Sequence, residues 1–304
     1  MLTTQGLRSL QARPLVGATK FYESNPAMIR NAQEKAETKL GTETLIITLL
    51  TDFGIADYYV AAMKGVILSR SPHAELVDIS HTIAPQNVLS AAYVLLGAYA
   101  QFPPGTIHLA VVDPGVGSSR RGIILRTARY DFVGPDNGLF SLIMPESVQA
   151  FEIQPSAYLP AMVSNTFHGR DIFAPVAAAL AAGVKVEELA NPIGQITRLP
   201  SLVEVTRTAT HSRIIHIDRF GNGITGIERR HLGSDILPPG FSLRVSSGHV
   251  IQKQKRFYAE GPVLSGQPFL IWGSLGFLEV SVANASAAEV LGLLCGQAVT
   301  LTLG

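Results

Sequence analysis

Short apolar, β-branched runs that alternate with helix-forming segments constrain the fold of this chain more than any other feature. The runs occupy residues 44–50, 75–79 and 106–112, and helical patterns near 57–70 and 87–101 separate them. Apolar strands spaced by helices of about a dozen residues are typical of parallel strands that are buried on both faces of a sheet. The sequence therefore predicts an α/β fold with a mainly parallel central sheet.

The pattern changes after an apolar helix expected from about Asp171 to Ala182. Residues 191–203 contain two prolines and a glycine, which predicts a linker. Short strand-like runs without long helices follow it, at 213–217, 241–247, 268–274, 277–283 and 298–303. These runs predict a smaller C-terminal β-barrel domain. The expected organisation is an N-terminal extension over residues 1–43, an α/β domain over 44–195 and a β-barrel domain over 200–304.

Charge and hydropathy argue against two classes of partner. Lys plus Arg number 24 and Asp plus Glu number 23, so the chain lacks the excess of basic residues with which proteins bind nucleic acid. The mean hydropathy of +0.26 is high. However, the purest apolar stretch, 172–184, contains Pro175 and Gly183 and is shorter than the roughly 20 residues that cross a bilayer. We therefore expect neither a nucleic-acid partner nor a membrane span.

The cysteine content and the N-terminal extension bear on location. Cys295 is the only cysteine, so no intrachain disulfide can form, and no Cys/His spacing fits a zinc site. A cytoplasmic location without a structural metal is therefore expected. The extension is basic before Glu23 but lacks the apolar segment of a secretory signal, and a peripheral helix is expected at 27–40, closed by Gly41. An organellar transit peptide is the alternative interpretation of this extension.

Three polar clusters follow predicted strands or precede a predicted helix, where ligands bind in open α/β sheets. The first is Thr51-Asp52-Phe53-Gly54, directly after the run at 44–50. A carboxylate such as Asp52 can accept both hydroxyl groups of a ribose. The alternative is an aspartate that caps a helix or shapes a turn. A protein kinase is disfavoured, because residue 52 leaves no room upstream for the other kinase motifs.

The second cluster spans residues 112–121 and contains two glycines and two arginines. Asp113 and Arg120 emerge from the same loop, so they are placed to pair with each other. No lysine follows the glycines, and Arg120 stands where a dinucleotide fingerprint needs a glycine, so a nucleotide-phosphate site is disfavoured. The alternative is a tight turn with solvated arginines.

The third cluster, residues 165–171, precedes the apolar helix. A helix dipole lowers the pKa of a histidine at its N-terminus, so His168 is expected to be a neutral acceptor that can act as a base or orient a water molecule. The alternative is that Asp171 caps the helix and His168 only packs. Among the other histidines only His81, in Asp78-Ile79-Ser80-His81, lies near a strand end, and the sequence assigns it no role.

These clusters and the segments between them resemble the S-adenosylmethionine hydroxide adenosyltransferase family, which is related to the halogenases that make 5′-fluoro- and 5′-chloro-5′-deoxyadenosine. The resemblance runs from about Leu45 to Leu303. It rests on TDFG, VDISH, VDPGVG followed by an arginine pair, PDNGL, TFHGRD, DRFGN and GSLGFLEVSVANASAA.

The resemblance implies an α/β domain joined to a β-barrel, in a homotrimer whose ligand sites lie at subunit interfaces. Its activity is the attack of water on C5′ of S-adenosylmethionine, which yields adenosine and L-methionine without a metal or other cofactor. The family's catalytic triad corresponds to Asp113, Arg120 and His168. Its nucleoside-binding positions correspond to Asp52, Asn222, Ser274, Glu279 and Asn284. The sequence departs from the family pattern at Ala283, where relatives often have asparagine, and at Asn284, where an apolar residue is common.

Two alternative functions are a halogenase and a non-catalytic sensor of S-adenosylmethionine or adenosine. Fluorinases have Tyr-Pro-Ala-Thr-Gly where this chain has residues 113–117, and Tyr-Ser at 168–169. A negative Asp113 would repel a halide, and the 14 residues between Arg121 and Asp136 leave no room for the fluorinase insertion. A sensor would keep the nucleoside contacts but tolerate loss of the triad, so the intact triad favours a hydrolase.

Overall fold

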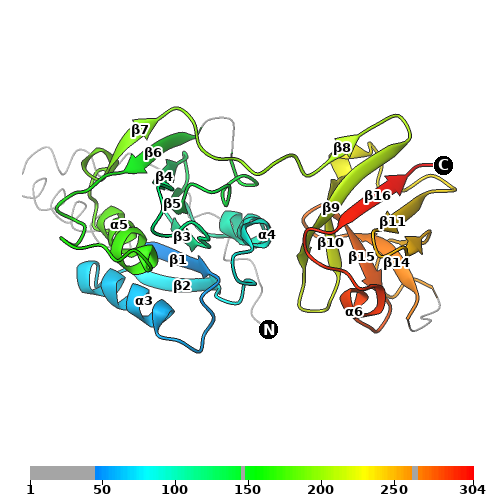
Figure 1. The fold of residues 1–304 in the computed structure, drawn as a ribbon, viewed down its shortest axis with the longest axis horizontal. Coiled ribbons are helices and arrows are strands. Elements are labelled where there is room, and N and C mark those ends of the chain that lie inside the picture. Colours follow the sequence, from blue (N-terminus) through cyan, green and yellow to red (C-terminus); the bar gives the residue numbers. More distant parts are fainter. Residues whose placement is uncertain (1–44, 145–147, 262–265) are drawn as a thin grey trace, which may run out of the picture. The chain divides into compact units, whose positions relative to one another are not determined.

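The structure, a computed structural model, describes residues 45–144, 148–261 and 266–304. These residues form two β-sheets (Figure 1), of seven and nine strands. No helix of the described segments is long and apolar enough to cross a membrane. The extension over residues 1–43, with the helix expected at 27–40, lies outside the described residues.

The first sheet has the strand order β2-β1-β3-β5-β4-β6-β7. Its strands are β1 (Ile46–Thr51), β2 (Glu75–Ser80), β3 (Ile107–Val111), β4 (Gly122–Arg126), β5 (Asp131–Pro135), β6 (Gln149–Ile153) and β7 (Ala190–Ile193). The predicted runs at 44–50, 75–79 and 106–112 are therefore strands, as expected. The four later strands were not predicted, and β7 takes up the start of the segment expected to be a linker.

The sheet is mixed rather than mainly parallel, which corrects the prediction. β1 pairs with β2 and β3 in parallel, and β3 pairs with β5 in parallel. β4, β6 and β7 pair with their neighbours antiparallel. The cause lies in the connection from β4 to β5, residues 127–130. Four residues suffice for a hairpin, whereas a parallel crossover needs a dozen or more.

Both faces of the parallel part of this sheet are buried, because its side chains alternate between two apolar layers. On β1, Ile47 and Leu49 join one buried cluster with Met63 and Ile67 of helix α3 (Tyr59–Arg70). Leu50 joins a second cluster on the opposite face. The near-continuous apolar character of the strands therefore has the expected cause.

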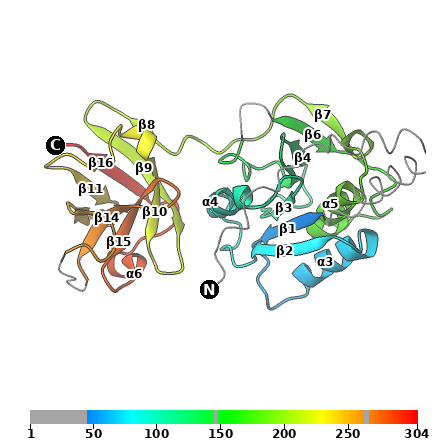
Figure 2. The same cartoon turned by 180° about the vertical axis from the view of Figure 1, so that it is seen from behind.

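Helices cover each face (Figure 2). On one side lie α3 and α5 (Ala174–Ala181), which contact each other, and on the other lies α4 (Val88–Ala98), followed by a 3₁₀ turn at Tyr99–Gln101. The helix expected from Asp171 begins instead as a π-helical turn, Gly169–Phe173, and becomes α-helical only at Ala174. Pro175 has no N–H for an α-helical bond to the carbonyl of Asp171, so it belongs in a first helical turn.

The second sheet is formed by the C-terminal part of the chain, which is rich in strands and shorter than the part that forms the first sheet, as predicted. It curls into a half-barrel (Figure 1). Its strands are β8 (Glu204–Val205), β9 (Ala209–Ile217), β10 (Gly223–Glu228), β11 (Ser242–Val245), β12 (Val250–Ile251), β13 (Gln254–Lys255), β14 (Pro268–Trp272), β15 (Phe277–Val282) and β16 (Ala298–Thr302). The five predicted runs are strands, and β8, β10, β12 and β13 are additional ones. A closed barrel and the domain boundaries stay predictions.

Short helices complete the described chain: 3₁₀ turns at Val186–Glu188 and Arg229–His231, and α6 (Ala287–Leu291). α4 also contacts the second sheet. Leu89 and Tyr93 pack near Ile215 and Phe277, and the Ser90 hydroxyl lies 2.7 Å from Nδ1 of His216. α4 is therefore apolar on two faces because both are covered.

Candidate active site

Two cavities are lined by the residues predicted to be functional, except Arg120, which lines neither of them. One, of about 530 Å³, lies at the carboxyl ends of the parallel strands and is lined by Asp52, Asp113 and His168. The other, of about 810 Å³, lies in the half-barrel and is lined by Asn222, Ser274, Glu279 and Asn284. Both fall within the range of small-molecule sites. We refer to them as the sheet cavity and the barrel cavity.

Asp52 stands at the end of β1 and projects into the sheet cavity. Its Oδ2 accepts a hydrogen bond of 2.7 Å from the backbone N–H of Gln86. Burial raises the pKa of Asp52, the Gln86 N–H opposes this effect, and the negative charge of Asp113 adds to it. Gln86 has a φ of +64°, which is uncommon for a residue other than glycine. The chain therefore adopts an unfavourable conformation at the point where it holds this carboxylate.

Asp113, Arg120 and His168 are brought together in the structure. Arg120 donates from Nε to Oδ1 of Asp113 at 3.1 Å and from Nη2 to Oδ2 of the same carboxylate. Nη2 of Arg120 also lies 3.1 Å from Nδ1 of His168. The side chains of Asp113 and Arg120 are only 5% and 8% exposed. Such a shielded, bidentate pair is strong and fixes the orientation of both groups.

The contact between Arg120 and His168 determines the tautomer of the neutral imidazole. A guanidinium can only donate hydrogen bonds, so Nδ1 of His168 must accept, and the ring proton is then on Nε2. His168 is a neutral acceptor through Nδ1, as expected, but Nδ1 already accepts a hydrogen bond from Arg120 and is not free to accept one from water. His168 can therefore donate to a bound oxygen from Nε2, and Asp113 is the acceptor that remains in this group.

The pKa of His168 is lowered, as expected. Burial has the largest effect, and the positive charge of Arg120 follows. Asp171 does not cap the helix through its side chain. Its carboxylate instead accepts from Arg170 Nε at 2.7 Å and from the Ser164 N–H at 2.9 Å, which closes the loop that carries His168.

Residues of the PDNGL motif form hydrogen bonds that support the loop of Asp113 and Arg120. Asn137 donates from Nδ2 to the carbonyl of Val112 at 2.8 Å, and Asp136 accepts from Arg121 Nε at 3.0 Å. The second arginine of the pair, Arg121, is therefore structural, while the first, Arg120, belongs to the candidate triad.

The loops of Asp113 and His168 meet at Gly117. A Cβ atom at this position would overlap with the carbonyl oxygen of Asn165, and the φ of Gly117 is +77°. Only glycine combines this conformation with so close an approach. This contact brings a loop after β3 and a loop before α5 near enough for Arg120 to reach His168.

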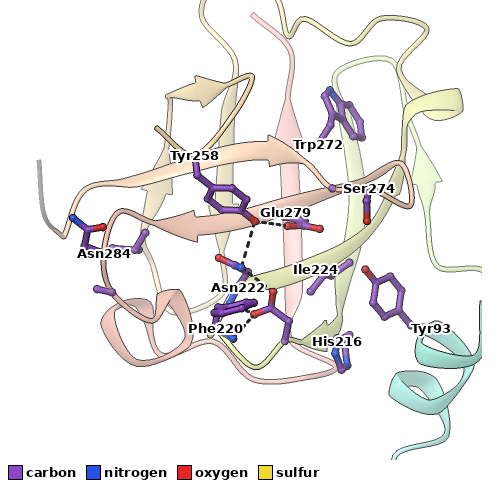
Figure 3. Close-up of a pocket in the computed structure, with 14 residues that line it drawn as sticks. Tyr93, His216, Phe220, Asn222, Ile224, Tyr258, Trp272, Ser274, Glu279 and Asn284 are labelled. Carbon is purple, nitrogen blue, oxygen red and sulfur yellow. Dashed lines mark hydrogen bonds between the residues drawn. The ribbon is translucent and has the colours of Figure 1, made fainter. Parts of the chain in front are cut away.

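Figure 3 shows the barrel cavity, in which Tyr258 reaches over Asn222 and Glu279. The Tyr258 hydroxyl donates to Oε2 of Glu279 at 3.1 Å, and Nδ2 of Asn222 donates to Oδ2 of Asp218 at 2.8 Å and lies 3.4 Å from the Tyr258 oxygen. Burial raises the pKa of Glu279, and burial together with Glu279 raises that of Tyr258 to about 12. The cavity thus presents a linked set of amide, carboxyl and phenol groups.

Ser274 and Asn284 line the same cavity at separate places (Figure 3). Asn284 has a φ of +55°, so the residue that departs from the family pattern occupies a left-handed turn, which asparagine tolerates better than most residues. Tyr93 of α4 and Trp272 add aromatic surface. Residue 273 is a glycine because its backbone lies close to Glu279, and a Cβ atom there would overlap with Oε1 of Glu279.

Sequence reasoning missed several of these residues. Tyr258 and Asp218 line the barrel cavity, and Gln86 lines the sheet cavity. Asp218 lies within the quoted DRFGN motif and was therefore open to prediction. Tyr258 and Gln86 carry no signal in the sequence, since their contacts join residues that are far apart along the chain.

The structure divides the predicted residues between the two cavities. Asp52, Asp113 and His168 line the sheet cavity together, and Asn222, Ser274, Glu279 and Asn284 line the barrel cavity, with no lining residue in common. Among the described residues, no group of three His, Cys, Asp or Glu side chains is placed to hold a metal ion.

Comparisons with known proteins connect both regions to one family. The model of the SAM hydroxide adenosyltransferase N-terminal domain matches residues 47–190, and that of the C-terminal domain matches 212–300. A protein of Thermus thermophilus named (R)-S-adenosyl-L-methionine hydrolase is 39% identical, over 84% of this chain and 98% of its own. The protein of that name from Salinispora tropica is 36% identical, over 85% and 98%. A fluorinase of Nocardia brasiliensis is 27% identical, over 85% and 97%.

Two solved structures share the fold over most of the chain. An uncharacterized conserved protein from Thermotoga maritima superposes with a TM-score of 0.75 at 33% identity, over 84% of this chain and 99% of that one. A conserved hypothetical protein from Thermus thermophilus has a TM-score of 0.67 at 37% identity, over 85% and 100%.

Proposed function

Because the chain belongs to the SAM hydroxide adenosyltransferase family, we propose that it is an enzyme that hydrolyses S-adenosyl-L-methionine to adenosine and L-methionine. The observation that carries this proposal is the enclosed contact of Asp113, Arg120 and His168 beside Asp52 in the sheet cavity. A binding protein has no need for a shielded acid next to a histidine of fixed tautomer.

The reaction is a substitution at C5′ of the ribose. A water oxygen forms a bond to C5′ while the bond from C5′ to sulfur breaks, and the bonding electrons stay on sulfur as the thioether of methionine. The water loses a proton, and the sulfonium loses its positive charge. Since the sulfonium is already a good leaving group, the enzyme mainly has to align the water and keep bulk solvent away.

The three residues of the triad divide this task. Asp113 accepts a hydrogen bond from the attacking water and takes up its proton as the bond to C5′ forms. Nε2 of His168 donates to the same oxygen and fixes its position. Arg120 holds both groups through contacts that the water does not have to displace. No step in this scheme requires a cofactor.

The remaining predicted residues hold the nucleoside in the proposal. Asp52 binds the ribose hydroxyls, since its carboxylate faces the cavity that contains the triad. Asn222, Ser274, Glu279 and Asn284 bind the adenosine from the barrel cavity.

We further propose that the two cavities of neighbouring subunits form one site, in a homotrimer. Large apolar side chains beside both cavities are exposed in the single chain, which supports an interface there. Ile55 and Tyr58, in the loop after Asp52, are 82% and 63% exposed, and Phe220, in the barrel cavity, is 79% exposed. Association of two copies would cover these side chains and exclude water from the reaction.

The proposal is tested by incubating the purified protein with S-adenosylmethionine and measuring adenosine and methionine. We expect both products in equal amounts, and a loss of rate of at least about 100-fold in Asp113→Asn and His168→Ala. Binding without product formation would favour a sensor. Formation of 5′-chloro-5′-deoxyadenosine in the presence of chloride would favour a halogenase.

A further inference from the structure

A series of polar contacts lies next to the turn that carries Asp52 and has no part in the chemistry proposed above. Nζ of Lys64 lies 2.7 Å from Oδ2 of Asp78, and Oδ1 of Asp78 lies 3.0 Å from Nε2 of His81. Nδ1 of His81 lies 2.8 Å from the Thr51 hydroxyl. Thr51 is fully buried and His81 is 6% exposed. The contacts therefore lead from the surface to the residue that precedes Asp52.

The donor and the acceptor of the hydrogen bonds in this series of contacts can be assigned. Burial alone would raise the pKa of Asp78, but the hydrogen bond from Lys64 and the close contact with His81 bring it below its usual value, so Asp78 is a carboxylate and only accepts. The proton of a neutral His81 is then on Nε2, and Nδ1 accepts from the Thr51 hydroxyl. The Thr51 oxygen in turn accepts from the N–H of Phe53 at 3.2 Å. Nε2 of His81 makes a close charged contact with Asp78 rather than an aligned hydrogen bond, so the imidazole is held by this contact and by the hydrogen bond with Thr51.

His81 thereby holds the chain on both sides of Asp52. It contacts Thr51 through its ring, and its backbone carbonyl accepts from the N–H of Gly54 at 2.7 Å. Gln86, five residues further along the same loop, donates its N–H to the Asp52 carboxylate. The loop between β2 and α4 thus fixes the position of the Asp52 turn and the orientation of its carboxylate.

An Asp-His-Thr series also occurs in nucleophilic catalysis, where a histidine activates a hydroxyl. Here the geometry argues against that role. Thr51 is fully buried, its oxygen is occupied by the Phe53 N–H, and neither Thr51 nor His81 lines the sheet cavity. The group is thus placed to act through Asp52 rather than on a substrate.

We propose that His81, fixed by Asp78 and linked through Thr51, is a positioning residue that sets the orientation of Asp52 for binding the ribose hydroxyls. The inference rests on the role of Asp52 in the proposed function. It assigns a purpose to the VDISH motif, which the catalytic scheme leaves unused.

The chain provides a matched control for the test. Thr48, on the same strand as Thr51, contacts Nδ1 of His108 at 2.8 Å through its hydroxyl, and both Thr48 and His108 are fully buried. Thr51→Val and Thr48→Val therefore remove the same kind of hydrogen bond from similar surroundings. Only the first interrupts the link to Asp52.

We expect Thr51→Val to raise KM for S-adenosylmethionine about tenfold with kcat within about twofold of wild type, because a ribose contact made equally in the ground and transition states affects binding alone. Thr51→Ser should restore KM. Thr48→Val should leave KM unchanged. Asp78→Ala, at a partly exposed position, removes the group that faces Nε2 of His81 and should raise KM in the same direction if Thr51→Val does not fold.

A binding measurement separates this inference from the proposed function. Calorimetry compares adenosine with 2′,3′-dideoxyadenosine, which lacks the ribose hydroxyls. Wild type and Thr48→Val should prefer adenosine at least about tenfold, and the preference should be lost in Thr51→Val. A preference retained in Thr51→Val and Asp78→Ala, or an equal KM increase in Thr48→Val, would overturn the inference and leave the hydrolase intact. Absence of any preference in wild type would refute the role of Asp52 itself, and the inference with it.

Discussion

His108 is a buried histidine outside the candidate site whose titration couples acidity to the stability of the fold. It is fully buried on β3 and stacks on Phe132, and burial lowers its pKa from 6.5 to about 4. Between these values the unfolded chain binds a proton that the folded chain does not, so stability is complete above pH 6.5 and falls as the pH is lowered toward 4.

The expected loss through His108 is on the order of 3 kcal/mol at pH 4. In His108→Asn, whose amide still has a polar atom for Thr48, the free energy of unfolding should depend less on pH between 4 and 6.5. Urea unfolding at several pH values measures it. His211→Asn, at an exposed position, is the control and should keep the wild-type dependence. An unchanged dependence in His108→Asn would contradict the assignment.

At the residue level the pairing predicted within one motif, Asp113 with Arg120, is present in the structure. Asp113, Arg120 and His168 were predicted and lie in contact. The tautomer of His168 was not predictable, because it depends on which nitrogen faces Arg120, 48 residues away. Tyr258 was missed for the same reason, since its hydroxyl contacts Glu279 across the half-barrel.

Between elements, the contact of the two loops that meet at Gly117 decides whether the triad forms. Gly117→Ala would force the loops apart, because a Cβ there overlaps with the carbonyl of Asn165. We expect kcat to fall about 10- to 100-fold, since a displacement of about 1 Å at a catalytic group has an effect of this size. Steady-state kinetics measures it.

Gly115→Ala is the matched control for this prediction. Gly115 lies in the same loop, its φ is not positive, and a Cβ there makes only ordinary contacts, 3.4 Å from the nearest atoms. Its kcat should stay within about twofold of wild type. Equal losses in the two variants would show that the loop tolerates no side chain at all, and that the approach to Asn165 is not the cause.

The sequence predicted the strands that are apolar along their whole length. It did not predict the strands whose conformation depends on hydrogen bonding to neighbouring strands. β1 and β3 were found because both of their faces are buried. β6 has only one buried residue, Phe151, and takes its conformation from its neighbours β4 and β7. The π-helical turn after His168 likewise has no periodicity of its own, and follows from packing of its Phe173 in the core.

For the whole molecule, the proposed sharing of sites between subunits predicts complementation. One chain carries Asp113→Asn, and the other carries Asn222→Ala with Glu279→Ala, so each alone has a defect in one cavity and is expected to be inactive. In mixed trimers from co-refolding at equal amounts, about a quarter of the interfaces would join two intact cavities. The mixture should therefore regain about a quarter of the wild-type activity.

Activity of the mixture no greater than the sum of the separately refolded variants would contradict the shared site. Wild type refolded in the same way is the control for recovery of active protein. Sedimentation of the wild-type chain should give three times the mass of one 32.5 kDa chain.

The proposed reaction requires that water attacks C5′, and oxygen labelling measures this step directly. The protein is incubated with S-adenosylmethionine in ¹⁸O-water, and both products are analysed by mass spectrometry. We expect one ¹⁸O atom in adenosine, at the 5′ position, and none in methionine, with the reaction suppressed in Asp113→Asn. Adenosine without the label, or no adenosine at all, would contradict the proposed reaction.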